Sequence, residues 1–237
     1  RRLIAELGAE WVHEIVSLQD GPLVTALRAD GRRVTVIDVP PRPPGLVTRS
    51  FALRNHLRSI GARLVHANGI KAALVCTTAR VGAATRVLWV KHDFSFEGAF
   101  ASSIGACVDR VVGVSRASIA GLRGPAARKA TFVHTGIDHV DADRERARSA
   151  LVEELGWPSD AFVVGAVGRL DPAKGHRELI RAVAEARDRI PNVHVVVAGA
   201  VDPNHPRTKE RLEVAGREHA IGDRLAVLDD CDDVRSL

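Results

Sequence analysis

The residues best able to do chemistry lie in one short stretch, Gly168–His176, which reads GRLDPAKGH. This stretch directly follows Phe162–Val167, a continuous apolar run of the kind found in strands that are covered on both faces. Asp171 is a favoured helix N-cap and Pro172 is a favoured first helical residue, so a helix is predicted to begin here. The pattern therefore places a loop and a helix N-terminus at the carboxyl end of a buried strand.

Three basic side chains surround this predicted helix start: Arg169 at the end of the strand, and Lys174 and His176 in the first helical turn. Cations at a helix N-terminus oppose the macrodipole, and they make sense where an anion occupies the site. A bidentate Arg together with the point charge of a Lys would suit a diphosphate. The alternative is a surface loop with incidental charges, in which Asp171 pairs with a neighbouring cation. The residues alone leave both interpretations open.

The composition predicts a globular protein longer than one ordinary domain. The chain has 237 residues, of which 46% are hydrophobic and 27% are charged. No apolar run reaches the length of about 18 residues that a membrane-spanning helix needs. The chain begins at Arg1 and contains no Met, which indicates a fragment or a processed chain.

The charged and sulfur-containing residues narrow the partners and the compartment. The formal net charge is +5, but the basic residues are scattered, which indicates a solvated surface and no nucleic-acid partner. A basic surface also fits peripheral contact with the inner face of an acidic membrane. Three widely separated Cys indicate reduced thiols and a cytoplasmic protein. Neither the Cys nor the His residues show metal-ligand spacing, so no metal is expected.

Short β-branched runs alternate with longer amphipathic runs, which predicts right-handed βαβ units and doubly wound parallel sheets of the α/β class. The predicted strands are His13–Leu18, Arg33–Val39, Arg63–His66, Arg86–His92, Arg110–Val114, Thr131–His134, Phe162–Val167, Val193–Ala198 and Arg224–Leu228. The predicted helices are Arg2–Leu7, Gly21–Ala29, Thr48–Ile60, Lys71–Val81, Arg144–Leu155, Lys174–Ile190 and Thr208–His219.

A loop, a helix and a turn between the sixth and seventh predicted strands mark the predicted domain junction. We predict a first domain at residues 1–138, a linker at 139–160 and the first half of a second domain at 161–237. In a doubly wound domain the helix at Arg2–Leu7 should follow a strand, so the first domain is expected to lack its first strand. The second domain shows only three strands, too few for a complete sheet of this class, and is expected to be incomplete.

Several segments resemble, in the same order, those of the GT-B glycosyltransferases of family 4. Val164–Ala182 is similar to the GRL-x-x-x-KG segment of that family, and Asp109–Ser115 resembles its last N-domain strand, which ends in Ser. His134–Asp138 resembles the N-G-I/V-D turn at the domain junction. Further similar segments are Ser17–Leu23, Leu27–Val36, Val65–Gly69 and Val90–Asp93. The similarity thus covers nearly the whole chain.

The resemblance implies two Rossmann-like domains that face each other across a cleft. It implies retaining transfer of a sugar from a nucleotide-sugar donor to a sugar, lipid or small-molecule acceptor, with no cofactor and no metal. Gly168, Arg169 and Lys174 match the residues that bind the donor diphosphate, where the two cations would stabilise the leaving nucleoside diphosphate.

The resemblance also assigns roles in the first domain and at the junction. His92 follows a predicted strand and matches the catalytic His that faces the donor sugar; the alternative is a satisfied strand-end histidine. Gly136 and Asp138 are expected to shape the hinge turn, Gly136 through a positive φ and Asp138 as the cap of the following helix.

The sequence departs from the family pattern at Thr135, where the family usually has Asn, and at Gly199–Asp202, which replaces a glycine-acid-glycine turn. The family's two glutamates eight positions apart and its N-terminal glycine loop are absent. A protein limited to these residues is therefore expected to be inactive or nearly so. Two alternatives remain: a sugar-nucleotide epimerase of the same architecture and a non-catalytic nucleotide-binding fragment. The Gly168–Lys174 segment favours the transferase.

Overall fold

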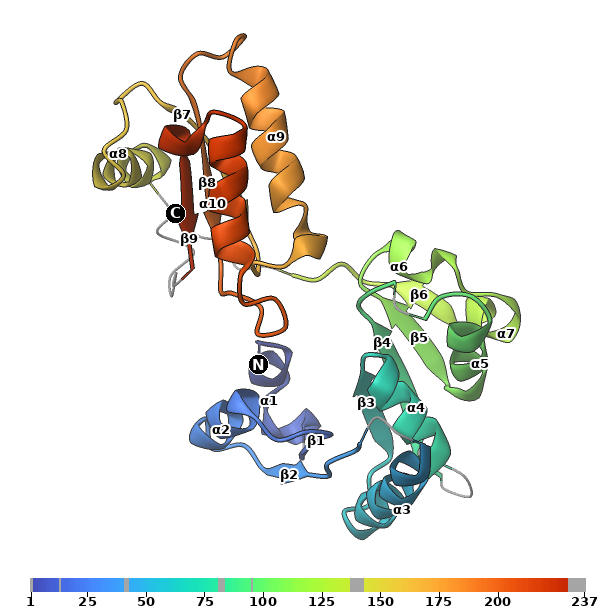
Figure 1. Ribbon diagram of the computed structural model, residues 1–237. Helices are drawn as coiled ribbons and strands as arrows, with labels where there is room; N and C mark the ends of the chain where they lie inside the picture. Colours follow the sequence, from blue (N-terminus) through green and yellow to red (C-terminus); the bar gives the residue numbers. More distant parts are fainter. Residues whose placement is uncertain are drawn as a thin grey trace. The chain divides into compact units, whose positions relative to one another are not determined.

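The computed structural model describes residues 2–12, 14–40, 43–80, 84–94, 96–136 and 143–229. The chain divides into two compact units, residues 1–137 (unit 1) and residues 138–237 (unit 2), which Figure 1 shows in blue to green and in yellow to red. All pairings between the described strands are parallel, so both units have the predicted α/β architecture.

Unit 1 contains two parallel sheets with helices between the strands. Its helices are α1 (Arg2–Trp11), α2 (Pro22–Ala29), α3 (Pro43–Ser59), α4 (Ile70–Ala79), α5 (Ala99–Cys107), α6 (Arg116–Ala120) and α7 (Gly124–Arg128). One sheet pairs β1 (Ile15–Ser17) with β2 (Val34–Val36). The other has the order β3 (Leu64–Asn68), β4 (Arg86–Lys91), β5 (Arg110–Gly113) and β6 (Ala130–Phe132).

The described strands of unit 1 form a pair and a set of four, since β1 and β2 pair only with each other. One expectation for this unit needs correction. The segment at Asp109–Ser115, matched to the last strand of the domain, contains β5, and β6 follows it and pairs with it. The Ser of this segment instead caps α6, because the Ser115 hydroxyl accepts a hydrogen bond from the Ser118 N–H at 3.1 Å.

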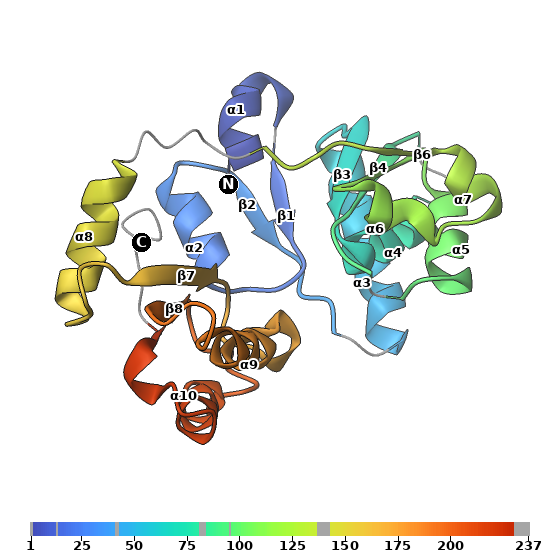
Figure 2. The ribbon, with the colours of Figure 1, turned by 90° about the horizontal axis from the view of Figure 1, so that it is seen from above.

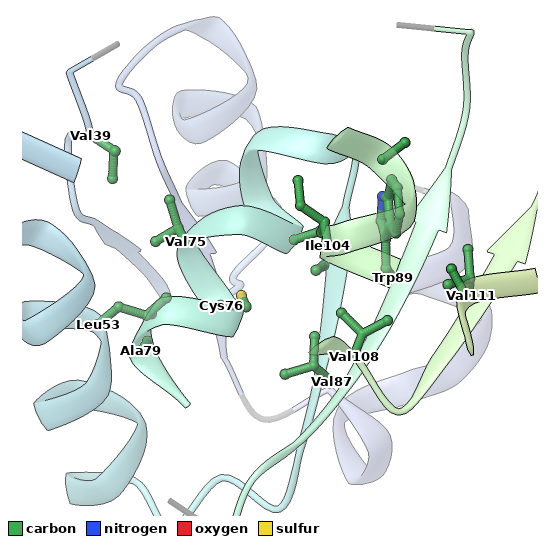
Figure 3. Packing of buried hydrophobic residues seen from close by; sticks show 14 of the residues in the cluster. Val39, Leu53, Val75, Cys76, Ala79, Val87, Trp89, Ile104, Val108 and Val111 are labelled. Carbon is green, nitrogen blue, oxygen red and sulfur yellow. The ribbon is translucent and has the colours of Figure 1, made fainter. Parts of the chain in front are cut away.

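The core of unit 1 lies between α3, α4 and the four-stranded sheet. Figure 3 shows Val75, Cys76 and Ala79 of α4 between Leu53 of α3 and the strand residues Val87 and Trp89, all of which are buried. This packing fixes β4, and with it the strand end that carries His92.

Unit 2 is a three-layer structure built on a three-stranded parallel sheet. Its elements are α8 (Arg144–Glu154), β7 (Phe162–Val167), the 3-10 turn η1 (Pro172–Lys174), α9 (His176–Ala186), β8 (Val193–Ala198), α10 (Thr208–Glu218), the 3-10 turn η2 (Gly222–Arg224) and β9 (Leu225–Leu228), and the strand order is β7-β8-β9. Figure 2 shows α8 on one side of this sheet and α9 and α10 on the other.

Alternating residues of β8 serve the two faces of the sheet. Val195 and Val197 pack with Ile180 of α9 on one face, while Val196 packs with Leu151 of α8 on the other. Every residue of β8 is buried, as its continuous apolar run predicts. The helix α8 falls within the span predicted as a linker at 139–160, and its contact with β8 makes it part of the layered structure.

The prediction that β7 is buried on both faces was wrong. Phe162 and Val167 are exposed, because β7 is the edge strand of the described sheet and lacks a neighbour on one side. A cavity of about 580 Å³ lies along β7 beside α8 and is lined by residues such as Leu151 and Gly165. Neither Arg169 nor Lys174 lines this cavity.

Candidate functional site

The loop after β7 is fixed by close backbone contact with the end of β8. The Gly168 N–H donates to the Ala198 carbonyl and the Leu170 N–H to the Ala200 carbonyl, each at 2.9 Å. Gly199, at φ +150°, lies so close that a Cβ there would be 2.2 Å from the Gly168 carbonyl oxygen. Only glycine therefore allows the two strand ends to approach in this way.

The loop then forms a short 3-10 turn instead of entering the long helix directly. Asp171 caps η1, because its Oδ1 accepts a hydrogen bond from the Ala173 N–H at 2.9 Å. The turn ends at Gly175, whose left-handed φ of 74° breaks the helical path, and α9 begins at His176. Lys174 was predicted to lie in the first turn of a continuous helix. It lies instead in the 3-10 turn before α9.

The N-terminus of α9 has no side-chain cap, since its N-cap residue is Gly175. The first backbone bond back to Gly175 comes from the Leu179 N–H, at 3.0 Å. The preceding N–H groups belong to the class that helices leave without intrahelical partners, and such groups bind anions. His176 was expected to be one of three basic side chains around this helix start. Its side chain is instead buried, and its Nε2 lies 3.1 Å from the Arg169 carbonyl oxygen, so it contacts the backbone of the loop.

The Arg169 side chain is held by two carboxylates while 55% of it stays exposed. Its Nη2 lies 3.2 Å from Asp171 Oδ2, and its Nε lies 3.1 Å from Asp202 Oδ2. A guanidinium has five N–H donors, so these two contacts leave donors for a further acceptor. Arg169 therefore pairs with Asp171, as one interpretation predicted. It also keeps donors for an anion, as the other interpretation predicted.

Asp171 carries a full negative charge at neutral pH. The hydrogen bond from the Ala173 N–H is the main cause that lowers the pKa of this carboxyl, and the positive charges of Arg169, His205 and Lys174 lower it further. Lys174 is exposed, and its charge acts on the Asp171 carboxyl, as that of Arg169 does.

Asp202 is a site residue that was not predicted. It follows β8, and its contact with Arg169 depends on the register between β7 and β8, which joins residues about 30 positions apart. The available signal was an acidic residue just beyond the carboxyl end of an apolar strand, where ligand-binding residues of parallel sheets gather.

In unit 1, His92 is exposed directly after β4. Its Nε2 is hydrogen-bonded to Oδ1 of Asn68, the last residue of the neighbouring strand β3. Since the amide oxygen can only accept, Nε2 donates this hydrogen bond, which leaves Nδ1 for another partner. The pKa of His66 on β3 is lowered, first by its partial removal from water and then by the charge of His92.

The residue before His92 is a buried cation. Lys91 is 2% exposed, and its Nζ donates to the Asp93 carbonyl and lies 3.4 Å from Glu97 Oε1. The ammonium also lies 5.9 Å from the centre of the Phe94 ring. Lys91 therefore holds the loop that follows His92.

The two residues predicted to shape the hinge turn give different outcomes. Gly136 does not adopt the expected positive φ, and a Cβ at this position would meet no atom within 4 Å, so neither property requires glycine. Asp138 lies outside the described residues. The helix that follows is capped by Asp143, whose Oδ1 accepts a hydrogen bond from the Arg146 N–H at 3.1 Å.

Across residues 2–12, 14–40, 43–80, 84–94, 96–136 and 143–229, no group of three or more His, Cys, Asp or Glu side chains is placed to hold a metal ion. Within the same ranges, no helix combines the length and the apolar character that crossing a membrane requires.

The two α/β units with parallel strands place the chain in a general class of proteins, those in which ligand sites gather at the carboxyl ends of parallel strands. The chain belongs to the family of glycosyl transferase 4-like domains, whose model matches residues 1–168. A second model, of the group 1 glycosyl transferases, matches residues 147–237. The resemblance to GT-B glycosyltransferases of family 4 is thus confirmed.

Curated relatives match over part of the chain. The D-inositol 3-phosphate glycosyltransferase of Corynebacterium jeikeium is 37% identical over 87 residues, which cover 36% of this chain and 21% of that protein. The enzyme of the same name from Mycobacterium bovis is 36% identical over 107 residues, covering 45% and 21%. The matched segments therefore span about a fifth of the length of these relatives.

Solved structures match over nearly the whole chain. Anabaena HepE in complex with UDP has a TM-score of 0.76 and 22% identity, and the match covers 98% of this chain and 65% of that chain. HepE in complex with UDP-glucose has a TM-score of 0.72 at the same identity, covering 93% and 62%. A glycosyltransferase from Rickettsia africae has a TM-score of 0.71 and 16% identity, covering 94% and 61%. These likenesses show the fold.

Proposed function

We propose that the loop after β7 binds the diphosphate of a nucleotide-sugar donor, as part of a retaining glycosyltransferase. The observation that carries the proposal is Arg169, which is exposed and held in place by two carboxylates with donors to spare. Lys174 and the uncapped N-terminus of α9 lie on the same short loop. Together they provide a guanidinium, an ammonium and backbone N–H groups for one anion.

This arrangement suits the leaving group of glycosyl transfer. When the bond between the sugar and the diphosphate breaks, negative charge develops on a phosphate oxygen. Arg169 and Lys174 stabilise that charge, and because Arg169 is already held in place, little reorganisation is needed at the moment of reaction. Gly168 contributes by its backbone, which positions Arg169 against the end of β8.

We assign His92 to the donor sugar. Its Nε2 is engaged by Asn68, which leaves Nδ1 as an acceptor for a sugar hydroxyl at the carboxyl end of β4. The end of β4 thus offers an imidazole and an amide, which are hydrogen-bonding groups that suit a sugar.

The related proteins support the identity of the donor. HepE has been solved with UDP and with UDP-glucose, and the curated relatives are named as glycosyltransferases. The acceptor is a sugar, a lipid or a small molecule. The net charge of +5 supports peripheral contact with acidic lipids, and the three widely separated Cys support a cytoplasmic enzyme.

Isothermal titration of the chain with UDP tests the proposal. Arg169→Ala should weaken UDP binding by about 10- to 100-fold, since hydrogen bonds to charged groups contribute about 1.5–3 kcal/mol. Lys174→Ala should weaken it by about five- to tenfold, because its single charge is exposed. Arg181→Ala is the matched control, an exposed Arg farther along α9, and it should leave the affinity unchanged. UDP binding that survives both Arg169→Ala and Lys174→Ala would overturn the site.

A further inference from the structure

The two carboxylates that hold Arg169 are bound very differently. We infer that Asp202 is a positioning residue that fixes the Arg169 guanidinium for the donor diphosphate, and that Asp171 is the counter-ion whose contact with Arg169 the diphosphate replaces. This inference rests on the proposed function. The two carboxylates would then have opposite effects on nucleotide affinity, although both are bound to the same side chain.

Asp202 is fixed at both carboxylate oxygens and along its backbone. It is 3% exposed, its Oδ2 accepts from Arg169 Nε, and its Oδ1 accepts from the Asn204 N–H at 2.8 Å. Its own N–H donates to the Leu170 carbonyl at 3.3 Å, beside the bridge between Leu170 and Val201. A carboxylate buried to this degree is costly without its charged partner, so Asp202 stays with Arg169 when a ligand binds.

Asp171 is bound less completely. One oxygen accepts from the Ala173 N–H, and the other contacts only the outer Nη2 of Arg169, at 3.2 Å. The positive charges of Arg169 and Lys174 act on the Asp171 carboxylate, and a diphosphate would bind to the same two cations. Since two like charges cannot share these donors at low cost, the diphosphate takes the Nη2 contact while Asp171 keeps its role as a cap.

The two carboxylates contact different nitrogens of the guanidinium, and the choice of nitrogen decides what each contact does. Nε is the donor nearest the side-chain stem, so the Asp202 contact restricts rotation of the whole plane. The outer Nη1 and Nη2 groups then face the ligand as a pre-set fork for phosphate oxygens. The entropy of ordering a long, exposed side chain is lost on folding and not on binding.

Two isosteric substitutions separate positioning from charge. Asp202→Asn and Asp171→Asn each remove one negative charge and each keep an oxygen for the backbone N–H that the carboxylate binds. In titrations with UDP, we expect Asp202→Asn to weaken binding about tenfold and Asp171→Asn to strengthen it two- to fivefold. If charge alone matters, both variants will bind UDP more tightly, and the inference is overturned.

A double-mutant cycle separates positioning from loop folding. In an Arg169→Ala background, Asp202→Asn should have no further effect on UDP affinity, because its effect acts through that guanidinium. A tenfold loss that persists in this background assigns Asp202 a merely structural role and overturns the inference. If Arg169→Ala itself leaves UDP binding unchanged, the proposed function fails instead.

A second variant decides the matter if Asp202→Asn unfolds unit 2, as judged by circular dichroism and amide hydrogen exchange. Asp202→Glu keeps the charge but moves the carboxylate by one methylene, so it should weaken UDP binding several-fold through misplacement of Arg169. Unchanged affinity in Asp202→Glu would contradict the positioning role.

Discussion

Each unit places a cation where a parallel strand ends, yet the two cations have opposite surroundings. Lys91, the last residue of β4, is 2% exposed and is bound to the loop that follows it. Arg169, just after β7, is 55% exposed and keeps donors available beyond its two carboxylate contacts. The same topological position therefore does not by itself make a cation available to a ligand. Availability depends on whether the following loop already binds all of the donors of that cation.

The largest expected effect tests the backbone contact on which the unit 2 edge depends. Gly199→Ala would place a Cβ 2.2 Å from the Gly168 carbonyl oxygen, and backbone atoms cannot move away as a flexible side chain can. We expect the free energy of unfolding of unit 2 to fall by about 3 kcal/mol or more. Urea unfolding followed by circular dichroism, with hydrogen exchange of β7 and β8 peptides, measures this loss.

Gly165→Ala is the matched control for this substitution. Gly165 lies in β7, and a Cβ there would meet no atom within 4 Å. The change should alter the free energy of unfolding by about 0.5 kcal/mol or less. Equal losses in the two variants would show that Gly199 has no special part in joining the strand ends.

The next prediction exchanges the two cations without changing the charge. Lys91→Arg forces a larger group into a buried site, and should lower the free energy of unfolding of unit 1 by about 1–3 kcal/mol while UDP affinity stays constant. Arg169→Lys removes the planar fork from an exposed site, and should lower UDP affinity about tenfold with little change in stability. Unfolding curves and titrations of both variants test the crossed pattern.

The pattern fails if either exchange affects the wrong property. A loss of UDP affinity in Lys91→Arg would make the unit 1 cation part of the ligand site. A large loss of stability in Arg169→Lys would make Arg169 mainly a structural residue, as the alternative of a surface loop with incidental charges assumed.

Local sequence patterns predicted the strands of unit 2 well but missed what depends on distant contacts. The bounds of β7 and β8 agree with the predicted ranges, because continuous apolar runs are a local signal. The exposure of β7 was missed, since a strand's place at the edge of a sheet is a property of the whole sheet. Asp202 was missed for the same reason: its contact with Arg169 requires the register of two strands.

Short elements and single backbone angles were also beyond local patterns. Helices α6 and α7 have five residues each, too few to show a helical period. The left-handed Gly175 was missed because a single Gly is compatible with a continuing helix, and only the observed φ shows that it ends η1. Arg169 and Lys174 were predicted to follow the strand closely, and both are exposed there, although Lys174 lies in η1 and not in the first turn of the helix.

The smallest expected effect concerns stability in acid. The two units should lose stability in different pH ranges. The pKa of His66 is lowered in the folded state, so below about pH 6.5 the unfolded chain binds more protons than unit 1 does. The free energy of unfolding of unit 1 should therefore fall as the pH drops through this range, and His66→Gln should remove that part of the fall. In unit 2, the lowered pKa values of Asp171 and Asp229 stabilise the fold above about pH 4, and this contribution is lost only at lower pH.

Tryptophan fluorescence can follow the two units separately, because Trp89 is in the core of unit 1 and Trp157 packs against the sheet of unit 2. Urea unfolding at pH 7.5 and pH 5.0 would be measured in variants that retain one of these Trp residues and carry Phe at the other two Trp positions. An acid-dependent loss at Trp89 that persists in His66→Gln would assign the sensitivity to other groups. A loss that disappears would assign the acid sensitivity of unit 1 to the uncharged imidazole of His66.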